Sequence, residues 1–447
     1  TTHYAAAHAV CGMDFEDRNS HADKTSYLGS YGTPVKPAAM LGKPHDGLGF
    51  GRFGDAAAAL GGDFLLKPGQ TVTLHYLLAI DTDVEAVTRL IDKYQSAAAG
   101  EAGVQRAEKT WMSMLDSVGI HSKRDDFDLL NNYWLPYQAI SGRLWGRTGL
   151  YQQSGARGFR DQLQDSQVWL PIDPGATRDQ ILLHATRQFV DGSVNHWWHA
   201  LADFGSHTAC SDDYLWLPLF TAIYIRETGD LSILKVKTPF MDDPAEVTLK
   251  EHCHRSIRRA FERTSPRGIP HIGSCDWNDG LSAMGVEEKG ESVWVGMFLS
   301  SILDEFAHVL EIDGDADKAR EYREQSRKYA AAVNEHGWDG GWYRYGTKDS
   351  GEWVGSRQSP EGKIHLNPQT WGILTGIASD EKAEMAWAAV KEHLLSPYGP
   401  LLLAPAYTQP DPDIGYITRY SPGSRENGGV YMHAATWALA AACKRRE

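Results

Sequence analysis

Residues 81–98 read "DTDVEAVTRLIDKYQSAA", and the period of the hydrophobic residues changes within this stretch. Asp-Thr-Asp is a typical helix-capping sequence, and Val87, Leu90 and Ile91 then fall on one face of a helix. The preceding residues 63–80, "DFLLKPGQTVTLHYLLAI", alternate instead as two strands joined by a Pro-Gly-Gln turn. The stretch therefore marks the passage from a β region to a helical region.

Helical patterns dominate the chain after this point. About ten of them follow one another, several end at Gly or Pro, and no convincing strands lie among them. They show no sequence repeat of fixed period. Counting elements in this way predicts a toroid of paired helices whose functional loops gather at one end.

The totals exclude several classes of protein. A chain of 447 residues with 42% hydrophobic and 23% charged residues is typical of a folded soluble protein of two or three domains. A net charge of −14 without a basic patch speaks against nucleic-acid binding. No apolar run approaches the roughly 20 residues needed to span a membrane, and the N-terminus lacks a signal-peptide pattern. Fifteen Trp fit either a sugar-binding cleft or a helical core.

The five cysteines are odd in number and far apart in the sequence, without a C-x-x-C spacing. This pattern argues against a disulfide framework and against a zinc cluster. We therefore expect a cytoplasmic protein without a metal.

Residues 273–285, "GSCDWNDGLSAMG", place Asp276 and Asp279 on either side of Trp277 and Asn278. Carboxylates beside a large aromatic ring suit carbohydrate chemistry. Asp, Asn and Gly also suit a tight loop that caps a helix, so both interpretations stay open for this loop.

Two further stretches are rich in charged side chains. Residues 155–169, "GARGFRDQLQDSQVW", contain the neighbours Arg160 and Asp161, which form either a structural ion pair or an acceptor for sugar hydroxyls. Residues 195–218, "NHWWHALADFGSHTACSDDYLWLP", contain three His and an Asp-Asp pair. These fit a metal site, the wall of a cleft, or, for the Asp pair, helix capping.

A fourth stretch, residues 419–441, "RYSPGSRENGGVYMHAATWALAA", surrounds a Gly-Gly that begins a predicted helix with Arg425, Glu426 and His433. Backbone N–H groups at a helix start attract anions, so phosphate fits here. A capped helix with a buried His is the alternative. The chain contains neither a phosphate-binding G-x-x-x-x-G-K-[ST] loop nor a G-x-S-x-G nucleophile elbow.

Six motifs occur in order along nearly the whole chain: "GFRDQLQD", "SDDYLWLP", "DWNDG", "GESVW", "PEGKIHLNPQTW" and "ENGGVYMHAATWA". Together they resemble glycoside hydrolase family 94, the inverting β-glycoside phosphorylases related to cellobiose phosphorylase, chitobiose phosphorylase and the phosphorylase-like region of cyclic β-1,2-glucan synthases. The resemblance implies a mainly α protein: part of a β-sandwich domain over residues 1–82, a helical linker over 83–122 and an (α/α)6 barrel over 123–447.

The resemblance also implies an inverting glycoside phosphorylase that cleaves a β-glucoside with inorganic phosphate to give α-glucose 1-phosphate. Phosphate is then a co-substrate, and no cofactor is needed. Matching the motifs residue by residue implies the general acid Asp279; donor-sugar contacts from Asp161, Arg160 and Trp277; acceptor-sugar contacts from Glu426, Arg425 and Tyr420; and a phosphate contact from His433.

The chain departs from the family pattern at two places. Where relatives carry a phosphate-binding Arg, six residues before Asp161, this chain has Gly155, and we expect Arg157 to take its place. The sequence stops at Glu447, before a further family segment with a phosphate-binding Thr-Gly pair and a donor-binding Gln. We therefore expect a missing C-terminal segment or a second chain to complete the barrel. The resemblance further implies a homodimer.

Two other functions stay open. An inverting β-glucan hydrolase on the same barrel would need a base, and Glu426 or Asp161 could serve. A non-catalytic fragment that only binds glucan is the second alternative.

Overall fold

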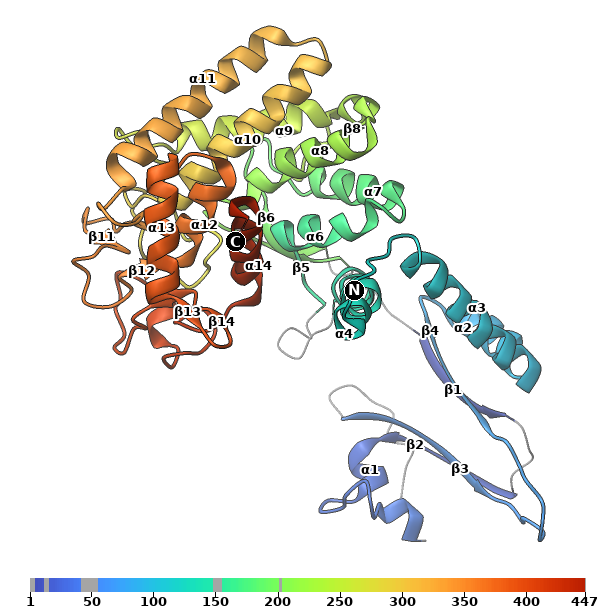
Figure 1. The fold of residues 1–447 in the computed structure, drawn as a ribbon. Coiled ribbons are helices and arrows are strands. Elements are labelled where there is room, and N and C mark those ends of the chain that lie inside the picture. Colours follow the sequence, from blue (N-terminus) through green and yellow to red (C-terminus); the bar gives the residue numbers. More distant parts are fainter. Residues whose placement is uncertain (1–4, 12–15, 42–54, 148–154, 201–202, 447) are drawn as a thin grey trace. The chain divides into compact units, whose positions relative to one another are not determined.

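The computed structural model describes residues 5–11, 16–41, 55–147, 155–200 and 203–446 (Figure 1). The chain forms two compact units, Thr1–Ser117 and Val118–Glu447. The boundaries expected after residues 82 and 122 stay predictions.

The first unit contains two separate antiparallel pairs of strands. Strand β1 (Ala5–Cys11) pairs with β4 (His75–Asp81), and β2 (Glu16–Asp23) pairs with β3 (Ala56–Asp63). The helices of this unit are α1 (Lys24–Leu28), the short 3-10 helix η1 (Ala38–Leu41), α2 (Val84–Tyr94) and α3 (Ala97–Leu115).

The predicted strand pair within residues 63–80 is wrong. The turn exists, since the Gln70 N–H donates to the Lys67 carbonyl over 2.9 Å and Gly69 has a φ of 79°. However, β3 ends before this turn, β4 begins after it, and each pairs with an upstream strand. These upstream partners are seven and eight residues long, so they offer longer ladders than the short segments beside the turn.

Helix α2 begins where the change of period predicted. The Asp83 carboxylate accepts a hydrogen bond from the Ala86 N–H and caps the helix, and Val87 is buried. The capping sequence and the apolar face therefore both act as predicted.

The second unit is built mainly from helices. Its α-helices are α4 (Asp125–Leu129), α5 (Leu135–Tyr137), α6 (Phe159–Asp165), α7 (Pro174–Ala185), α8 (Trp216–Thr228), α9 (Leu249–Glu262), α10 (Val293–Ile312), α11 (Ala316–Ala332), α12 (Leu366–Thr375), α13 (Asp380–His393) and α14 (Met432–Arg445). Shorter 3-10 and π-helical turns are η2 (Leu130–Trp134), η3 (Gln138–Trp145), η4 (Ser166–Trp169), η5 (Asp213–Leu215), η6 (Leu231–Lys235), η7 (Val333–Gly337) and η8 (Tyr416–Arg419).

Short strands do lie among these helices, contrary to the prediction. An antiparallel three-stranded sheet joins β5 (Arg157–Gly158), β6 (Asn195–His199) and β7 (Phe204–His207). Further pairs are β8 (Lys237–Thr238) with β9 (Val247–Thr248), β10 (Gly346–Thr347) with β11 (Trp353–Val354), β12 (Ile364–His365) with β15 (Leu403–Ala404), and β13 (Leu395–Ser396) with β14 (Gly399–Pro400). Most are two residues long, which is too short for an alternating pattern to reveal.

Alternate helices of this unit pack on one another: α6 on α8, α8 on α10, α10 on α12, and α12 on α14. Helices α11 and α13 follow as partners of α10 and α12 (Figure 1). This is the arrangement of inner and outer helices that a toroid of paired helices needs. Closure into a ring of six pairs stays a prediction.

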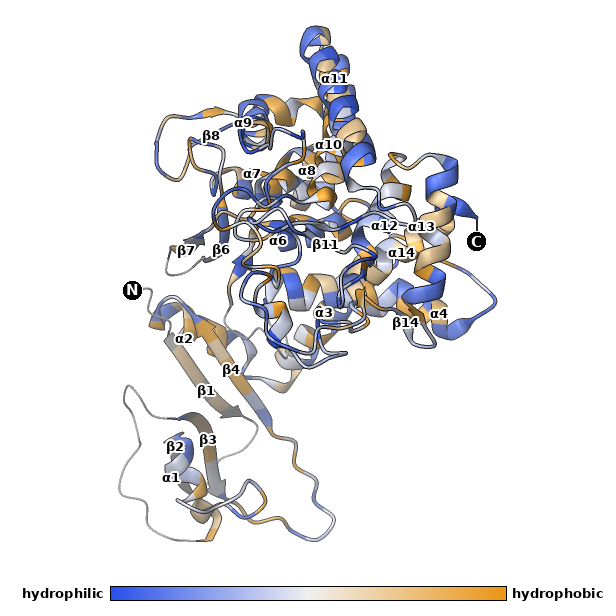
Figure 2. Ribbon diagram, turned by 90° about the vertical axis from the view of Figure 1, so that its left-hand side faces the viewer, coloured by the Kyte–Doolittle hydropathy of each residue, from blue (hydrophilic) through white to orange (hydrophobic). Residues whose placement is uncertain are grey.

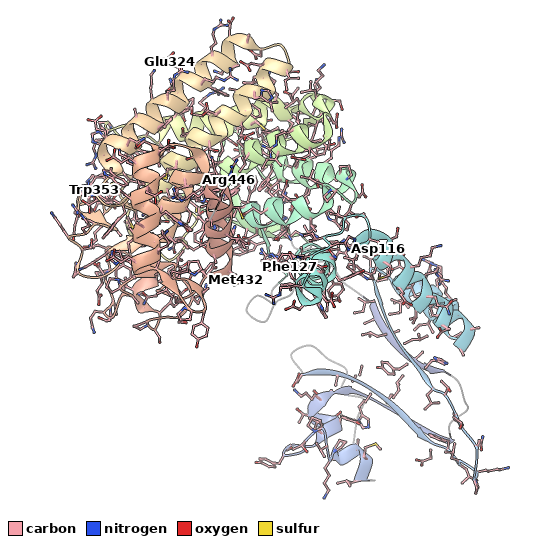
Figure 3. The ribbon with its side chains drawn as sticks, viewed as in Figure 1. Asp116, Phe127, Glu324, Trp353, Met432 and Arg446 are labelled. Carbon is pink, nitrogen blue, oxygen red and sulfur yellow. The ribbon has the colours of Figure 1, made fainter. Side chains whose placement is uncertain are left out.

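Helix α10 runs through the core of the second unit. Contrary to the expectation from the sequence, this helix of 20 residues is long and apolar enough to cross a membrane by length and composition. However, 78% of its most apolar window is buried inside the protein, as in the core helix of a folded domain. Its neighbour α11 is largely hydrophilic on its surface (Figure 2); Glu324 on this helix, labelled in Figure 3, is more than half exposed.

Candidate active site

A cavity of about 750 Å³ lies within the second unit. Of the residues predicted from the sequence, it is lined by Arg160, Asp161, Trp277, Asp279, Arg425, Glu426 and His433. These residues come from α6, from the loop after α9 and from the segment before and into α14. The fold therefore brings residues from all four charged stretches to one cavity. The stretch of residues 195–218 contributes His196 and His199.

The loop around residues 276–280 is held by Asp276. The Asp276 side chain is fully buried and accepts hydrogen bonds from the Asn278 N–H (3.0 Å), the Tyr345 hydroxyl (2.6 Å) and the Ser292 hydroxyl (2.7 Å). Ser292 also caps α10 by accepting from the Val295 N–H. Burial raises the pKa of Asp276 to about 6. Asp276 therefore stabilises a tight loop, as one interpretation expected, but Ser292 rather than Asp276 caps the helix.

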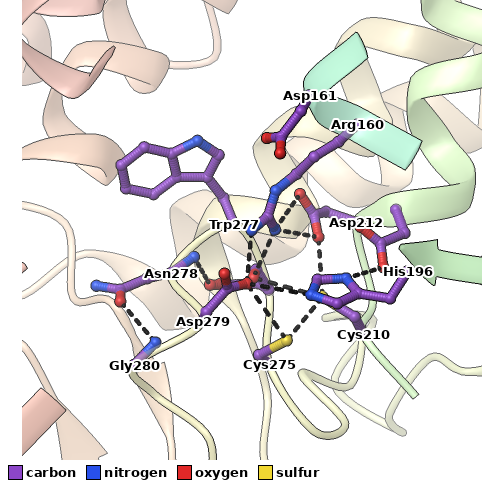
Figure 4. Close-up of polar contacts among 12 residues, drawn as sticks. Arg160, Asp161, His196, Cys210, Asp212, Cys275, Trp277, Asn278, Asp279 and Gly280 are labelled. Carbon is purple, nitrogen blue, oxygen red and sulfur yellow. Dashed lines mark hydrogen bonds and ion pairs between the residues drawn. The ribbon is translucent and has the colours of Figure 1, made fainter. Parts of the chain in front are cut away.

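Asp279 instead faces the cavity, and its side chain is 39% exposed. Its Oδ1 atom accepts a hydrogen bond from Arg160 Nη2 over 2.5 Å. The His196 Nε2 atom lies 3.9 Å from the same oxygen (Figure 4). The two acids of the motif thus have different surroundings: one holds the loop and the other is open to a ligand.

Arg160 joins three segments of the site. It is buried, and besides Asp279 its guanidinium contacts the Asp212 carboxylate at 3.3 Å and the Asp276 carbonyl at 3.1 Å. Asp212 is completely buried and also accepts from Trp216 Nε1 over 2.9 Å. A charge removed from water in this way needs its partner. Arg160 is therefore both a wall of the cavity and a structural residue.

Asp161 lies among three arginines. Arg147 Nη2 donates to Asp161 Oδ2 over 2.8 Å, and Arg143 Nη2 lies 4.0 Å from Oδ1. Burial opposes the charged form, but Arg160, Arg147 and Arg143 outweigh it and hold the pKa of Asp161 below its usual value. Asp161 is therefore an ionised acceptor, which is what a contact to a sugar hydroxyl requires.

Trp277 and His433 form a hydrogen-bonded aromatic pair. Trp277 is buried, its Nε1–H donates to His433 Nδ1 over 3.2 Å, and the ring centroids are 5.2 Å apart. Burial lowers the pKa of His433 to about 4, so this His is neutral near pH 7. Because its Nδ1 accepts, its proton lies on Nε2.

The pair of acids at the start of η5 does not cap a helix with its side chains, contrary to one interpretation of the sequence. Asp212, at the N-cap position, makes no capping hydrogen bond with its side chain. Asp213 is buried and contacts His196 Nδ1 over 2.7 Å. The carboxylate of Asp213 outweighs burial and raises the pKa of His196 to about 12. The third His of this stretch, His207, contacts Ser193 instead.

The predicted acceptor residues differ in their placement. Glu426 is 5% exposed, and its Oε2 makes no hydrogen bond within the described residues, although Arg425 Nε lies 3.4 Å away. Arg425 has a φ of 50° and stacks over the Tyr420 ring at 4.7 Å. Tyr420 is not among the described residues that line the cavity. Helix α14 begins at Met432, after the left-handed Gly428 (φ 77°), and so later than the predicted Gly-Gly start.

The expected phosphate-binding Arg157 is also absent from the described lining of the cavity, because it pairs with Trp198 as part of β5. Gly155 has a φ of 73°, which favours Gly over the family's Arg. Arg143 and Arg147, which sequence reasoning missed, line the cavity instead. The sequence "SGRLWGR" that carries them has no distinguishing motif.

Two of the cysteines are in contact, although 65 positions separate them. Cys210 Sγ and Cys275 Sγ lie 2.8 Å apart, both buried beneath Asp279 (Figure 4). The bridge between Cys210 and Gly273 aligns the two segments. These two cysteines, far apart in the sequence, therefore meet in space. Cys210, His196 and Asp279 form a group that could hold a metal, and Cys275 lies beside it.

Known proteins match nearly the whole chain. A family model described as the glycosyl hydrolase 94 superfamily catalytic domain matches residues 110–445, and the glycosyl hydrolase 94 supersandwich domain matches residues 1–97. The cyclic β-(1,2)-glucan synthase NdvB of Rhizobium meliloti (strain 1021) is 35% identical over 439 residues, which cover 94% of this chain and 16% of that protein. The solabiose phosphorylase of Paenibacillus borealis is 33% identical over 94% of this chain and 53% of its own length. An N,N'-diacetylchitobiose phosphorylase of Vibrio proteolyticus is 31% identical, covering 85% of this chain and 50% of its own. The chain thus spans about half the length of these phosphorylases.

Proposed function

This chain belongs to the glycosyl hydrolase 94 family, and from this membership we propose that it is an inverting glycoside phosphorylase. It cleaves a β-glucoside with inorganic phosphate and releases α-glucose 1-phosphate. Two of the relatives above are phosphorylases by name. The supersandwich and catalytic-domain matches also support the predicted order of a β domain followed by a helical domain.

One observation carries this proposal: a single cavity combines the open carboxyl of Asp279 with a neutral His433 and several arginines. An inverting hydrolase needs a second carboxylate to activate water, whereas phosphate is already a nucleophile. A site for phosphate needs instead N–H donors for the phosphate oxygens.

Asp279 is the general acid in this proposal. It gives its proton to the glycosidic oxygen as the bond from that oxygen to the anomeric carbon breaks. A phosphate oxygen forms the new bond to the anomeric carbon from the opposite face, so the β-linkage becomes an α-phosphate. Arg160 and His196 both lie on the Oδ1 side of Asp279, at 2.5 Å and 3.9 Å. Their positive charges favour the transferred proton on Oδ2.

Phosphate lies against Arg143, Arg147 and His433 in this proposal. The Arg143 side chain is 47% exposed, and its Nε–H donates to Asp165 Oδ1 over 2.7 Å, so its terminal N–H groups remain for an anion. His433 donates through Nε2–H, since Trp277 occupies Nδ1. These arginines supply the charge that the family pattern places at residue 155, which is Gly here.

The sugars occupy the remaining walls. Asp161, held ionised by its arginines, accepts hydrogen bonds from hydroxyl groups of the donor sugar. Trp277 lines this donor position. Glu426 offers the acceptor sugar a buried Oε2 without a hydrogen bond among the described residues, and Arg425 lies beside it.

The test runs the reaction in reverse. The protein is incubated with α-glucose 1-phosphate and one acceptor at a time: glucose, gluconate, N-acetylglucosamine, cellobiose or sophorose. Release of inorganic phosphate that depends on one acceptor supports the proposal and identifies that acceptor. Release of sugar from β-glucans at the same rate with and without phosphate contradicts it.

A hydrolase is the second candidate, because a general base would present to water a carboxylate oxygen such as Glu426 Oε2, which accepts no hydrogen bond from the described residues. The same incubations separate the two. A hydrolase releases glucose from β-glucan oligosaccharides in phosphate-free buffer, and Glu426→Gln abolishes that release.

A further inference from the structure

A cluster of four potential metal ligands lies at the base of the cavity. The side-chain ligand atoms of His196, Cys210 and Asp279 all lie within 4.8 Å of one another. Cys275 Sγ lies 2.8 Å from Cys210 Sγ and 3.9 Å from Asp279 Oδ1. Figure 4 shows these four side chains converging from β6, from the segment before η5 and from the loop after α9. In the proposed reaction Asp279 donates the proton and His196 lies beside it, whereas the two cysteines have no role.

We propose that His196, Cys210, Cys275 and Asp279 bind one soft or borderline divalent metal ion, such as Zn²⁺ or Cd²⁺. Two thiolate sulfurs, one imidazole nitrogen and one carboxylate oxygen form a four-ligand set of the kind that these ions prefer. Hard ions such as Mg²⁺ prefer oxygen ligands, so the set also predicts selectivity.

The surroundings of His196 provide an independent reason for this site. Metal-binding His residues usually donate their other ring N–H to a carboxylate, which fixes the orientation of the ring. His196 Nδ1 contacts Asp213 Oδ2 over 2.7 Å, and Asp213 is buried. This contact leaves Nε2 directed toward Asp279, at 3.9 Å.

The backbone fixes the two cysteines opposite each other. Cys210 forms a β-bridge with Gly273, and the Ser211 N–H donates to the Cys275 carbonyl over 2.9 Å. A tetrahedral ion with bonds of about 2.3 Å to sulfur holds two sulfurs about 3.8 Å apart. The sulfurs therefore separate by about 1 Å when the ion enters. It enters from the cavity, which both His196 and Asp279 line.

Binding of the ion displaces protons from the ligands. Burial raises the pKa of the Cys210 thiol well above its ordinary value, so the thiol keeps its proton until a metal displaces it. Each cysteine then releases its thiol proton to water, His196 releases its Nε2 proton, and the ion bonds to the two thiolate sulfurs and to the freed ring nitrogen. Arg160 loses its contact with Asp279 but keeps those with Asp212 and the Asp276 carbonyl.

The bound ion would inhibit the enzyme, and this consequence rests on the proposed function. A carboxylate bonded to a metal cannot donate a proton to the glycosidic oxygen. Metal binding itself does not depend on that function, so the two claims can fail separately.

The experiment titrates the reduced, chelator-treated full chain with Cd²⁺. Equilibrium dialysis measures stoichiometry, and the ultraviolet charge-transfer band of cadmium–thiolate bonds reports the ligands. We expect a tight site for one ion that is lost in Cys210→Ser and in Cys275→Ser. Asp213→Asn should weaken binding by about 10- to 100-fold. Cys443→Ser, which changes an exposed cysteine, is the matched control and should bind as the unchanged protein does.

Alkylation of the unchanged protein keeps the test valid if a variant does not fold. Cadmium should protect Cys210 and Cys275 from a maleimide while Cys443 reacts. Equal labelling with and without cadmium overturns the proposal, as does full cadmium binding by the Cys210→Ser, Cys275→Ser double variant. If cadmium binds at these cysteines but phosphorolysis continues, the site stands and the role of Asp279 is wrong.

Discussion

The two acids of the loop at residues 276–280 should respond differently to the same substitution. Asp279→Asn removes the proton donor but preserves the shape of the side chain. Its side chain is 39% exposed, and its partner Arg160 keeps the Asp212 carboxylate and the Asp276 carbonyl. We therefore expect stability to change by about 1 kcal/mol or less. The chemical step should suffer much more.

General acid catalysis contributes about 10² to 10⁴ in rate. A sugar alkoxide is a poor leaving group, so we expect the upper part of this range for an oligosaccharide. A 10³- to 10⁴-fold loss of kcat/KM corresponds to about 4 to 5.5 kcal/mol of transition-state stabilisation. Fluoride departs without a proton, so phosphorolysis of β-glucosyl fluoride by Asp279→Asn should stay within about tenfold of the unchanged enzyme.

The assay measures phosphate-dependent turnover of both donors, with Asp276→Asn as the matched control. Asp276 is buried and bonded to Asn278, Tyr345 and Ser292, so its substitution acts through the loop and should lower both rates by the same factor. The reasoning is refuted if Asp279→Asn also lowers both rates equally, or if it lowers neither.

Three further experiments test the site and the stability of the fold. Arg160→Met leaves the buried Asp212 carboxylate without its charged partner and should lower the free energy of unfolding, measured in urea, by about 3–5 kcal/mol. Adding Asp212→Asn should recover at least about 1 kcal/mol of this loss. If the effects of the two substitutions simply add, the two side chains do not interact. Burial lowers the pKa of His254 to about 4. Since this is below its unfolded value of about 6.5, the unfolded chain binds the extra proton, and stability falls as pH drops from about 6.5 toward 4. His254→Gln should lessen the loss between pH 7 and pH 5 by up to about 2 kcal/mol, and an unchanged slope would exclude this contribution. Trp277→Phe removes the N–H donor that fixes the tautomer of His433. The KM for phosphate should rise by about tenfold, with a smaller effect on the KM for the sugar. An unchanged KM for phosphate would mean that phosphate binds elsewhere.

Local signals predicted the parts of the fold that depend on neighbouring residues. Asp83 caps α2 and Val87 is buried, because a cap and a helical period act within a few positions. The strand pairs in the first unit could not be predicted in this way. Strand β4 pairs with β1, some 70 residues earlier, and no property of the turn after Lys67 indicates that partner.

The candidate site shows the same division. Trp277 and Asp279 stand out because they lie two positions apart in an unusual motif, and both line the cavity. Arg143 lies in the π-helical turn η3 and Cys210 contacts Cys275 across 65 positions. Such residues acquire their significance only from tertiary contacts, so composition and spacing could not single them out.

Arg160 explains why stability and reactivity are linked in this site. One buried guanidinium contacts Asp212, the Asp276 carbonyl and Asp279. Burying this charge is unfavourable unless its partners are held in place, and Asp276 is held by the residues that also begin α10. The core helix therefore positions the loop, the loop positions Arg160, and Arg160 fixes one oxygen of Asp279. An acid placed by so many packed contacts needs little reorganisation when the substrate binds. We therefore expect that even conservative substitutions of Arg160 lower activity before they unfold the protein.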